Sequence, residues 1–284
     1  MVTTFLNSVS LAAILGLVAI GLAVIFGVRG VINLAHGELF VLGAYSTVWF
    51  DGRGLSLWFG VVAAPFVVGA IGWALEVTVV RRLYTRPIDT LVATFGLSII
   101  IREIIKLSFG KGSRNVPLPL SGQVDLLGTS YPQYRLFLTA ASAVILGTVA
   151  WLAVRTDIGV KVRAVIQRRP MAEAMGIDGR RIDQGIFVMG AALAGLAGAL
   201  MAPLITLNPE VGPTFLARSF LVVIIGGIGS VLPAIGSAIV IGLSEGLISS
   251  YIRPVYAQML LFVVAIVVLC VRPTGLFRRG GEPS

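Results

Sequence analysis

The hydrophobic and polar positions divide this chain into apolar runs that are separated by short polar connections. Most runs reach the length of about 20 apolar residues that a helix needs to cross the hydrocarbon layer. The runs are Phe5–Val28, Val31–Phe50, Leu57–Val80, Thr90–Phe109, Leu136–Val154, Ile186–Leu204, Phe215–Ile228, Ala234–Ile248 and Tyr256–Val271. The pattern predicts an all-α polytopic membrane protein with about eight or nine transmembrane helices, because the short seventh and eighth runs could form one broken segment.

The longest polar interruption is a basic loop at 155–183. Within it, Pro170–Gly179 is predicted to form a short helix, because proline suits a first helical turn and Gly176 and Gly179 suit helix ends. The loop is the part of the chain best suited to contact something outside the bilayer.

The predicted helix has an apolar face. Met171, Ala174 and Met175 follow the i, i+3, i+4 spacing that places side chains on one side of a helix. Such a face fits a groove on another protein. It fits equally well an interfacial helix on anionic lipid, where the flanking arginines would contact head groups. The residues alone leave both interpretations open.

Composition agrees with a membrane protein. The chain is 57% hydrophobic and 12% charged, which leaves too little polar surface for a soluble domain of 284 residues. The single cysteine, Cys270, excludes a disulfide framework, and the single histidine, His36, excludes a multi-histidine metal site. We therefore expect residues 1–284 to form one transmembrane domain with no metal site and no catalytic residues.

The basic residues predict the orientation in the membrane. Arg81, Arg82 and Arg86, the loop at 155–183, and a tail with Arg272, Arg278 and Arg279 belong on the cytoplasmic side. Nine spans satisfy this with the N-terminus outside and the C-terminus in the cytoplasm. The positions of Lys111 and Arg114 disagree with this orientation, because they fall in a connection that must be external. That connection, Gly110–Gln133, is predicted to be a loop with one short element.

Three polar residues lie early in the second apolar run. Asn33, His36 and Glu38 are costly within a span unless they face protein or a water-filled path. Asn33 and His36 are three residues apart and are predicted to share a helical face, while Glu38 points elsewhere. The three residues could simply satisfy nearby backbone groups, but as a cluster they favour a role in a pathway or gate, with His36, Arg29 or backbone groups as the partner of Glu38.

Other charged residues interrupt the apolar runs. Glu103 and Lys106 have the spacing of an ion pair within one helix, close to Arg102. Glu76 and Glu245 could be pathway residues or partners of arginines on other helices, and the sequence does not separate these interpretations.

Small residues recur at intervals of four. Gly190, Ala194 and Gly198 form one series, and Ala238, Gly242 and Gly246 form another, as expected where helices pack closely. Glycine-rich residues 226–230 predict a break or a tight crossing. No glycine-rich loop followed by lysine and Ser or Thr occurs, so the chain has no ATP site of that kind.

Several of these segments resemble one family. Residues 31–45 are similar to the signature near the start of branched-chain amino acid permeases, the membrane subunits of bacterial ABC importers. Residues 173–176 and 191–198 resemble the second half of that family, and residues 223–230 and 271–277 resemble its closing segments. The resemblance covers nearly the whole chain.

The resemblance implies an assembly in the bacterial inner membrane. The expected partners are a second permease subunit, with which the chain would form a heterodimer, two ATP-binding subunits and a periplasmic substrate-binding protein. The ATP-binding subunits would hydrolyse ATP with magnesium. Glu173, Ala174 and Gly176, with Met171, fall on the loop by which such permeases engage their ATPases. Met175 departs from the usual Glu-Ala-Ala, since it occupies the third place. The resemblance thus favours a protein groove over lipid for this helix.

The implied function is transport of branched-chain or related hydrophobic amino acids. The chain itself would not be an enzyme. One alternative is an ABC permease for urea or short amides, since such relatives exist in the family. A more distant alternative is an ion-coupled secondary transporter that uses Glu38, Glu76 or Glu245.

Overall fold

A computed structural model describes residues 2–30, 33–126, 128–227 and 231–271. Ten α-helices occur in these ranges. The first five are α1 (Val2–Arg29), α2 (His36–Asp51), α3 (Leu57–Thr78), α4 (Pro87–Phe109) and α5 (Gln133–Arg155). The others are α6 (Asp157–Ala174), α7 (Gly179–Met201), α8 (Gly212–Gly226), α9 (Val231–Ile248) and α10 (Pro254–Val271).

Short elements connect some of these helices. The 3-10 turns η1 (Val80–Arg82) and η2 (Ala202–Leu204) follow α3 and α7, and an antiparallel hairpin, β1 (Gln123–Leu126) with β2 (Thr129–Pro132), lies between α4 and α5. The hairpin agrees with the expectation of one short element in this connection. The predicted tail arginines at 272, 278 and 279, the family-like ending after residue 271 and residues 228–230 of the glycine-rich segment lie outside the described residues.

Each of the nine apolar runs corresponds to a helix, and α6 is the additional helix. Six helices are long and apolar enough to cross a membrane (α1, α3, α5, α7, α9 and α10), and α8 is a shorter apolar helix. The predicted count of eight or nine spans is therefore not confirmed. The helix α2 begins only at His36, since residues 33–35 form a turn, and α4 carries Arg102, Glu103 and Lys106.

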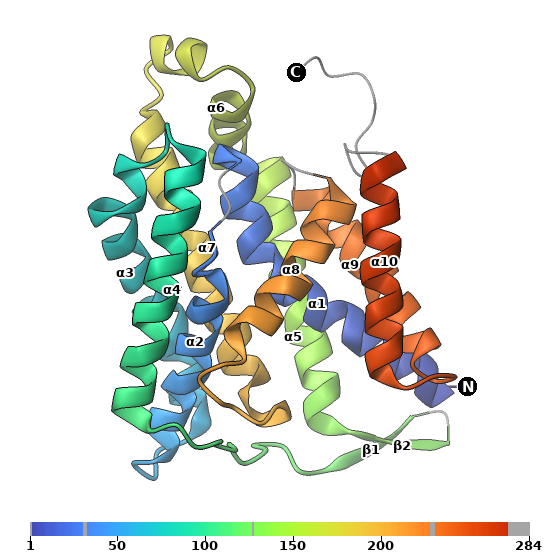
Figure 1. The fold of residues 1–284 in the computed structure, drawn as a ribbon. Coiled ribbons are helices and arrows are strands. Elements are labelled where there is room, and N and C mark those ends of the chain that lie inside the picture. The colour runs from blue at the N-terminus through green and yellow to red at the C-terminus, as the bar shows by residue number, and fades with distance from the viewer. Residues whose placement is uncertain (1, 31–32, 127, 228–230, 272–284) are drawn as a thin grey trace.

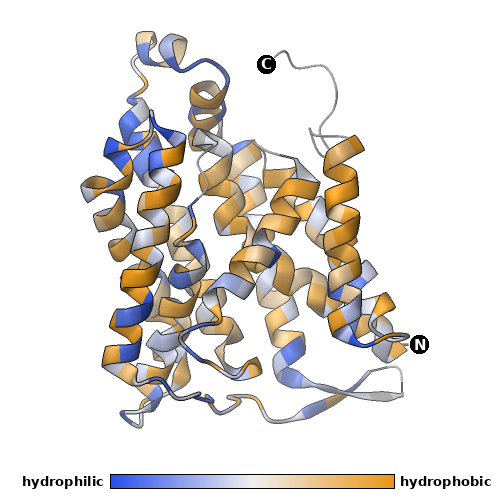
Figure 2. Ribbon diagram, viewed as in Figure 1, coloured by the Kyte–Doolittle hydropathy of each residue, from blue (hydrophilic) through white to orange (hydrophobic). Residues whose placement is uncertain are grey.

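The helices stand side by side, with α6 at one end of the bundle and the β-hairpin at the other (Figure 1). The turn between α3 and α4 and the end of α10 lie at the α6 end, whereas α1 begins near the hairpin end. Apolar side chains cover most of the bundle, and hydrophilic residues gather at the α6 end of α3 and α4 and in α6 (Figure 2). The predicted basic segments that are described thus share one end.

The helix contacts repeat in two halves of the chain. The contact of α1 with α9 matches that of α7 with α3, and the contact of α1 with α8 matches that of α7 with α2. The helices of the first half, α1–α4, run in directions opposite to those of α7–α10 (Figure 1). The chain is therefore built from two inverted four-helix halves, an arrangement found in many transporters.

The small-residue series hold the halves together, as predicted. A Cβ atom added at Gly190 of α7 would lie 2.6 Å from the carbonyl oxygen of Gly21 in α1, and one added at Gly198 would overlap the backbone of Phe40 in α2. Gly242 of α9 lies equally close to Ala12 of α1. Glycine is required at these positions because the helix backbones touch.

Two helices begin inside the bundle. Before α2, the side-chain oxygen of Asn33 accepts a hydrogen bond from the Ala35 amide at 3.0 Å, and before α8 that of Asn208 accepts one from the Glu210 amide at 2.8 Å. A glycine follows each asparagine by four positions, and these two glycines, Gly37 and Gly212, meet at backbone contact. The first turns of α2 and α8 therefore meet inside the protein.

Candidate functional site

The polar residues at the start of α2 are all buried, but they are not arranged as predicted. The helix begins at His36, so Asn33 lies in the turn before it and the two do not share a helical face. Asn33 is 2% exposed and closes its turn through Ala35. His36 is 1% exposed and packs on α1, because a Cβ atom at Gly21 would lie 3.0 Å from its ring. The asparagine side chain competes with helical hydrogen bonds, which explains the later start of the helix.

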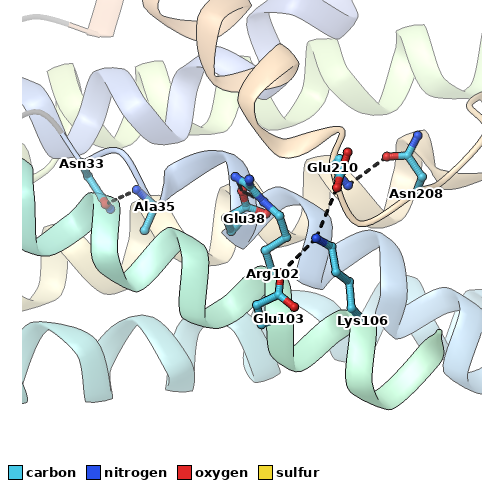
Figure 3. Close-up of polar contacts among 8 residues, drawn as sticks. All are labelled: Asn33, Ala35, Glu38, Arg102, Glu103, Lys106, Asn208 and Glu210. Carbon is cyan, nitrogen blue, oxygen red and sulfur yellow. Dashed lines mark hydrogen bonds and ion pairs between the residues drawn. The ribbon is translucent and has the colours of Figure 1, made fainter. Parts of the chain in front are cut away.

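Glu38 forms an ion pair with Arg102 of α4, 64 positions away (Figure 3). The Nη2 and Nε atoms of Arg102 donate to Oε1 of Glu38 at 2.7 and 3.2 Å. The carboxylate is 2% exposed and the guanidinium side chain 22%. Glu38 is therefore held by a residue from another helix that was not among its expected partners, which were His36, Arg29 and backbone groups. The Arg29 side chain lies outside the described residues.

The Glu38 carboxylate also faces the first turn of α8. A Cβ atom at Gly212 would lie 2.7 Å from Cδ of Glu38, so only glycine leaves room for the carboxylate there. Among the described residues, its second oxygen, Oε2, has no hydrogen-bond partner. A helix N-terminus carries partial positive charge, which favours an anion at this position. Glu38 is thus held between a guanidinium and a helix end.

A second group of charges lies one turn further along α4. Lys106 contacts Glu103 at 2.9 Å and Glu210 at 3.2 Å (Figure 3). The predicted pairing of Glu103 with Lys106 is confirmed, although Glu103 is 54% exposed and the pair is not internal. Arg102 and Lys106, at i and i+4, thus face α2 and the segment before α8 together. That spacing was visible in the sequence, whereas nothing in the sequence indicated Glu38 or Glu210 as partners.

The other two buried acids occupy separate places. Glu245 of α9 is 7% exposed and lines a small cavity with Arg218 of α8 and Gln258 of α10. Arg218 donates a hydrogen bond to Gln258 at 3.0 Å. Glu76 of α3 is 1% exposed and accepts a hydrogen bond from the hydroxyl of Tyr84 at 3.4 Å. Neither acid joins the Glu38 cluster.

The predicted helix within the polar loop differs from the expected one. The helix α6 has a kink at Arg168, whose φ of −148° and ψ of 84° are not helical, and a further turn follows. Gly176, at φ 84°, ends this turn as predicted. Gly179 does not end it and is instead the first residue of α7, because the Asp178 side chain caps that helix.

We call residues 169–176 the docking segment. Met171 and Met175 are 59% and 78% exposed, while Ala172 is buried against the bundle. Glu173, Ala174 and Gly176 are also exposed. The segment therefore presents the predicted methionine face outward at the α6 end of the molecule (Figure 1). Within the described ranges, no three His, Cys, Asp or Glu side chains are grouped so that they could hold a metal ion.

Comparison with known proteins identifies relatives over nearly the full chain. The profile of the family described as branched-chain amino acid transport system / permease component matches residues 4–269. The chain is 31% identical to the high-affinity branched-chain amino acid transport system permease protein LivH of Escherichia coli K12, over 96% of this chain and 94% of the relative. It is 28% identical to the corresponding permease protein BraD of Pseudomonas aeruginosa, with the same coverage.

Two further proteins are less similar. LivM of E. coli K12, also described as a permease protein of the branched-chain system, is 25% identical over 92% of this chain and 67% of the relative. A solved inward-facing structure described as an ABC transporter of the metal-chelate type aligns at 15% identity with a TM-score of 0.44, covering 94% of this chain and 83% of that chain.

Proposed function

The chain belongs to the branched-chain amino acid transport permease family, and we propose that it is the membrane subunit of an ABC importer for branched-chain or related hydrophobic amino acids. The match over residues 4–269 carries this proposal, because it includes every helix that could form the transport path. The importer would move its substrate across the bacterial inner membrane. Separate subunits would supply the energy by hydrolysing ATP with magnesium. The chain is then a transport subunit and not an enzyme.

A second permease subunit is the first partner that we propose. The chain matches both LivH and LivM, two permease proteins that occur together in E. coli, so a heterodimer is the expected arrangement. The exposed face of α4 supports a partner there. It carries the exposed apolar side chains of Ile100, Ile104 and Leu107 beside the half-exposed Glu103, and such a mixed surface suits a protein partner better than lipid alone.

The ATP-binding subunits would engage the docking segment. Met171, Ala174 and Met175 form its exposed apolar face, and Glu173 and Gly176 border it. Flexible methionine side chains suit a groove on another protein. Docking of the ATP-binding subunits there would put the α6 end, and with it the end of α10, on the cytoplasmic side. The hairpin end would then be free to meet the periplasmic substrate-binding protein.

Docking can be tested with Met175→Glu, which adds a charge to an exposed site and disturbs no contact of the bundle. We expect the ATP-binding subunits to be lost from the purified complex, because a groove that accepts methionine rejects a carboxylate. Lys161→Glu is the matched control, since it changes charge on the other part of α6, outside the docking segment. Normal assembly and uptake by the Met175 variant would show that the segment does not dock.

The start of α2 is the proposed gate of the pathway. Asn33, His36 and Glu38 lie where two helix ends meet at mid-bundle, and Arg102 fixes the carboxylate from a third helix. Irregular backbone inside a membrane protein is tolerated where it lines a cavity or is packed against protein. An ion pair that joins α2 to α4 can open when the helices separate, which suits a gate.

Two alternatives differ in substrate and in energy source. Urea or a short amide would require the same assembly but a different binding protein, and an ion-coupled transporter would require none of the partners. The native complex, purified without a tag on the permease, should contain two ATP-binding subunits and support leucine uptake in proteoliposomes with ATP. Uptake by the isolated chain in an ion gradient, without ATPase subunits, would contradict the proposal.

A further inference from the structure

The docking segment is tied to α7 through one arginine. Nη1 of Arg169 donates to both carboxylate oxygens of Asp183 at 2.9 and 3.3 Å, and its Nε donates to Glu173 at 2.8 Å. The Asp183 side chain is 2% exposed, whereas that of Glu173 is 48% exposed. One guanidinium therefore joins an exposed acid of the docking segment to a buried acid of α7.

The backbone leaves room for this contact. A Cβ atom at Gly179, the first residue of α7, would lie 2.6 Å from Oε1 of Glu173 and 2.7 Å from Nη2 of Arg169. Burial disfavours the charged guanidinium, but the carboxylates of Asp183 and Glu173 outweigh it and raise the pKa of Arg169. The planar guanidinium can hold two carboxylates at once, which lysine cannot do with the same geometry.

The backbone departs from the helical conformation at both ends of the docking segment. The kink at Arg168 separates it from the first part of α6, and Gly176 at φ 84° turns the chain toward α7. Besides the buried side chain of Ala172, the Arg169 ion pairs tie the docking segment to the bundle, and they connect it directly to α7.

From α7 onward, the packing is close. The backbone at Gly195 and Gly198 touches that of α2 at Gly43 and Phe40, so a displacement of α7 displaces α2 as well. The helix α2 carries Glu38 and its ion pair with Arg102. A continuous chain of contacts thus leads from the docking segment to the proposed gate.

We propose that Arg169 is the positioning residue that couples movement of the docking segment to α7, and through α7 to the gate. This inference rests on the proposed binding of ATPase subunits to the docking segment. In this role Arg169 touches neither ATP nor substrate. It makes the docking segment and α7 move as one body, and without it the docking segment follows the ATPases while the helices stay in place.

The test uses the complete importer with Arg169→Gln in proteoliposomes, and it measures melting temperature, ATPase rate and uptake on the same preparation. We expect an assembled complex whose ATPase rate stays near that of the wild type while uptake falls about tenfold, so that ATP consumed per substrate rises by the same factor. Arg180→Gln is the matched control. Arg169, Arg180 and Asp183 line one cavity, and the control removes an exposed arginine from it that has no ion pair within the described residues. It should leave the ratio unchanged.

A charge exchange separates coupling from simple stability. Arg169→Glu combined with Asp183→Arg recreates the pair in reverse, and Glu76 lines the same cavity as residue 183 and favours an arginine there. The double variant should recover most of the uptake that each single variant loses. The inference is overturned by any one of three results. These are an unchanged amount of ATP consumed per substrate in Arg169→Gln, an equal fall of ATPase rate and uptake in that variant, or no recovery of uptake in the double variant. If Met175→Glu leaves assembly intact, the docking proposal fails instead, whatever Arg169 does.

Discussion

The two inverted halves share a backbone plan but differ in charge. In the first half, Arg102 of the fourth helix reaches the Glu38 carboxylate of the second. In the other half, Gln258 of α10 accepts a hydrogen bond from Arg218 of α8, so this contact joins a neutral amide to an arginine, beside the buried Glu245 of α9. Each second helix begins inside the bundle after an asparagine turn.

This difference indicates that the halves have separate tasks. Burying most of an ion pair costs desolvation energy, and removing one partner strongly destabilises the protein. Such a pair therefore adds little net stability, and stability alone does not explain its presence. A hydrogen bond from a guanidinium to a neutral amide leaves no buried carboxylate unpaired when the amide is removed, so its loss costs less. We infer that the first half holds a contact suited to opening and closing, and that the corresponding contact in the second half serves mainly to hold helices together.

The largest effect should come from separating the halves. Gly198→Leu forces a side chain into the backbone of Phe40, which cannot move aside, and we expect a loss of about 3 kcal/mol or more in stability. Gly185→Leu in the same helix, α7, is the control, because nothing lies within 4 Å of a Cβ atom there. Melting temperature and elution as a single species from size-exclusion chromatography measure both. Equal behaviour of the two variants would mean that the close packing of α7 on α2 is unnecessary.

Removing one partner of the contact between the second and fourth helices should lower the stability of the protein by different amounts in the two halves. Arg102→Met leaves the Glu38 carboxylate buried and unpaired, and the expected loss is about 2 kcal/mol, less than for a fully buried pair because Arg102 is partly exposed. Gln258→Met removes a neutral partner and should cost about 1 kcal/mol. Adding Glu38→Gln to Arg102→Met should recover part of the stability. Similar melting temperatures for the two single variants would remove the proposed distinction between the halves.

Neutralising the buried acids tests which half contains the gate. Glu38→Gln preserves shape and some hydrogen bonding, so we expect a folded complex with ATPase activity near that of the wild type and uptake reduced about tenfold. Glu245→Gln, at the buried acid of α9 in the other half, should lower the melting temperature slightly and leave uptake nearly normal. Normal uptake with a lowered melting point for Glu38→Gln would make it a structural residue.

The smallest effect is expected at Lys106. Its partners Glu103 and Glu210 are 54% and 70% exposed, and exposed ion pairs contribute little because water and salt screen them. Lys106→Met should therefore keep melting temperature and uptake close to those of the wild type. A loss of uptake as large as that of Glu38→Gln would extend the gate to the segment before α8.

The sequence determined the helices through composition and spacing. Apolar runs predicted nine of the ten α-helices in the described ranges, because exclusion from water is a local property of each run. The spacing of small residues predicted close helix packing, because the sequence itself shows where side chains are small enough for two helix backbones to approach. The methionine face of the docking segment and its end at Gly176 were also predictable from local spacing.

Only the tertiary structure decided how α2 begins and which residue pairs with Glu38. The run from Val31 reads as continuous helix, but the Asn33 side chain takes the Ala35 amide, and Leu34 donates to Thr94 of α4. Arg102 is 64 positions from Glu38 and was predicted to lie near its own helix neighbours. Sequence patterns carry information about neighbours along the chain, whereas a buried charge is satisfied by whichever helix the fold brings beside it.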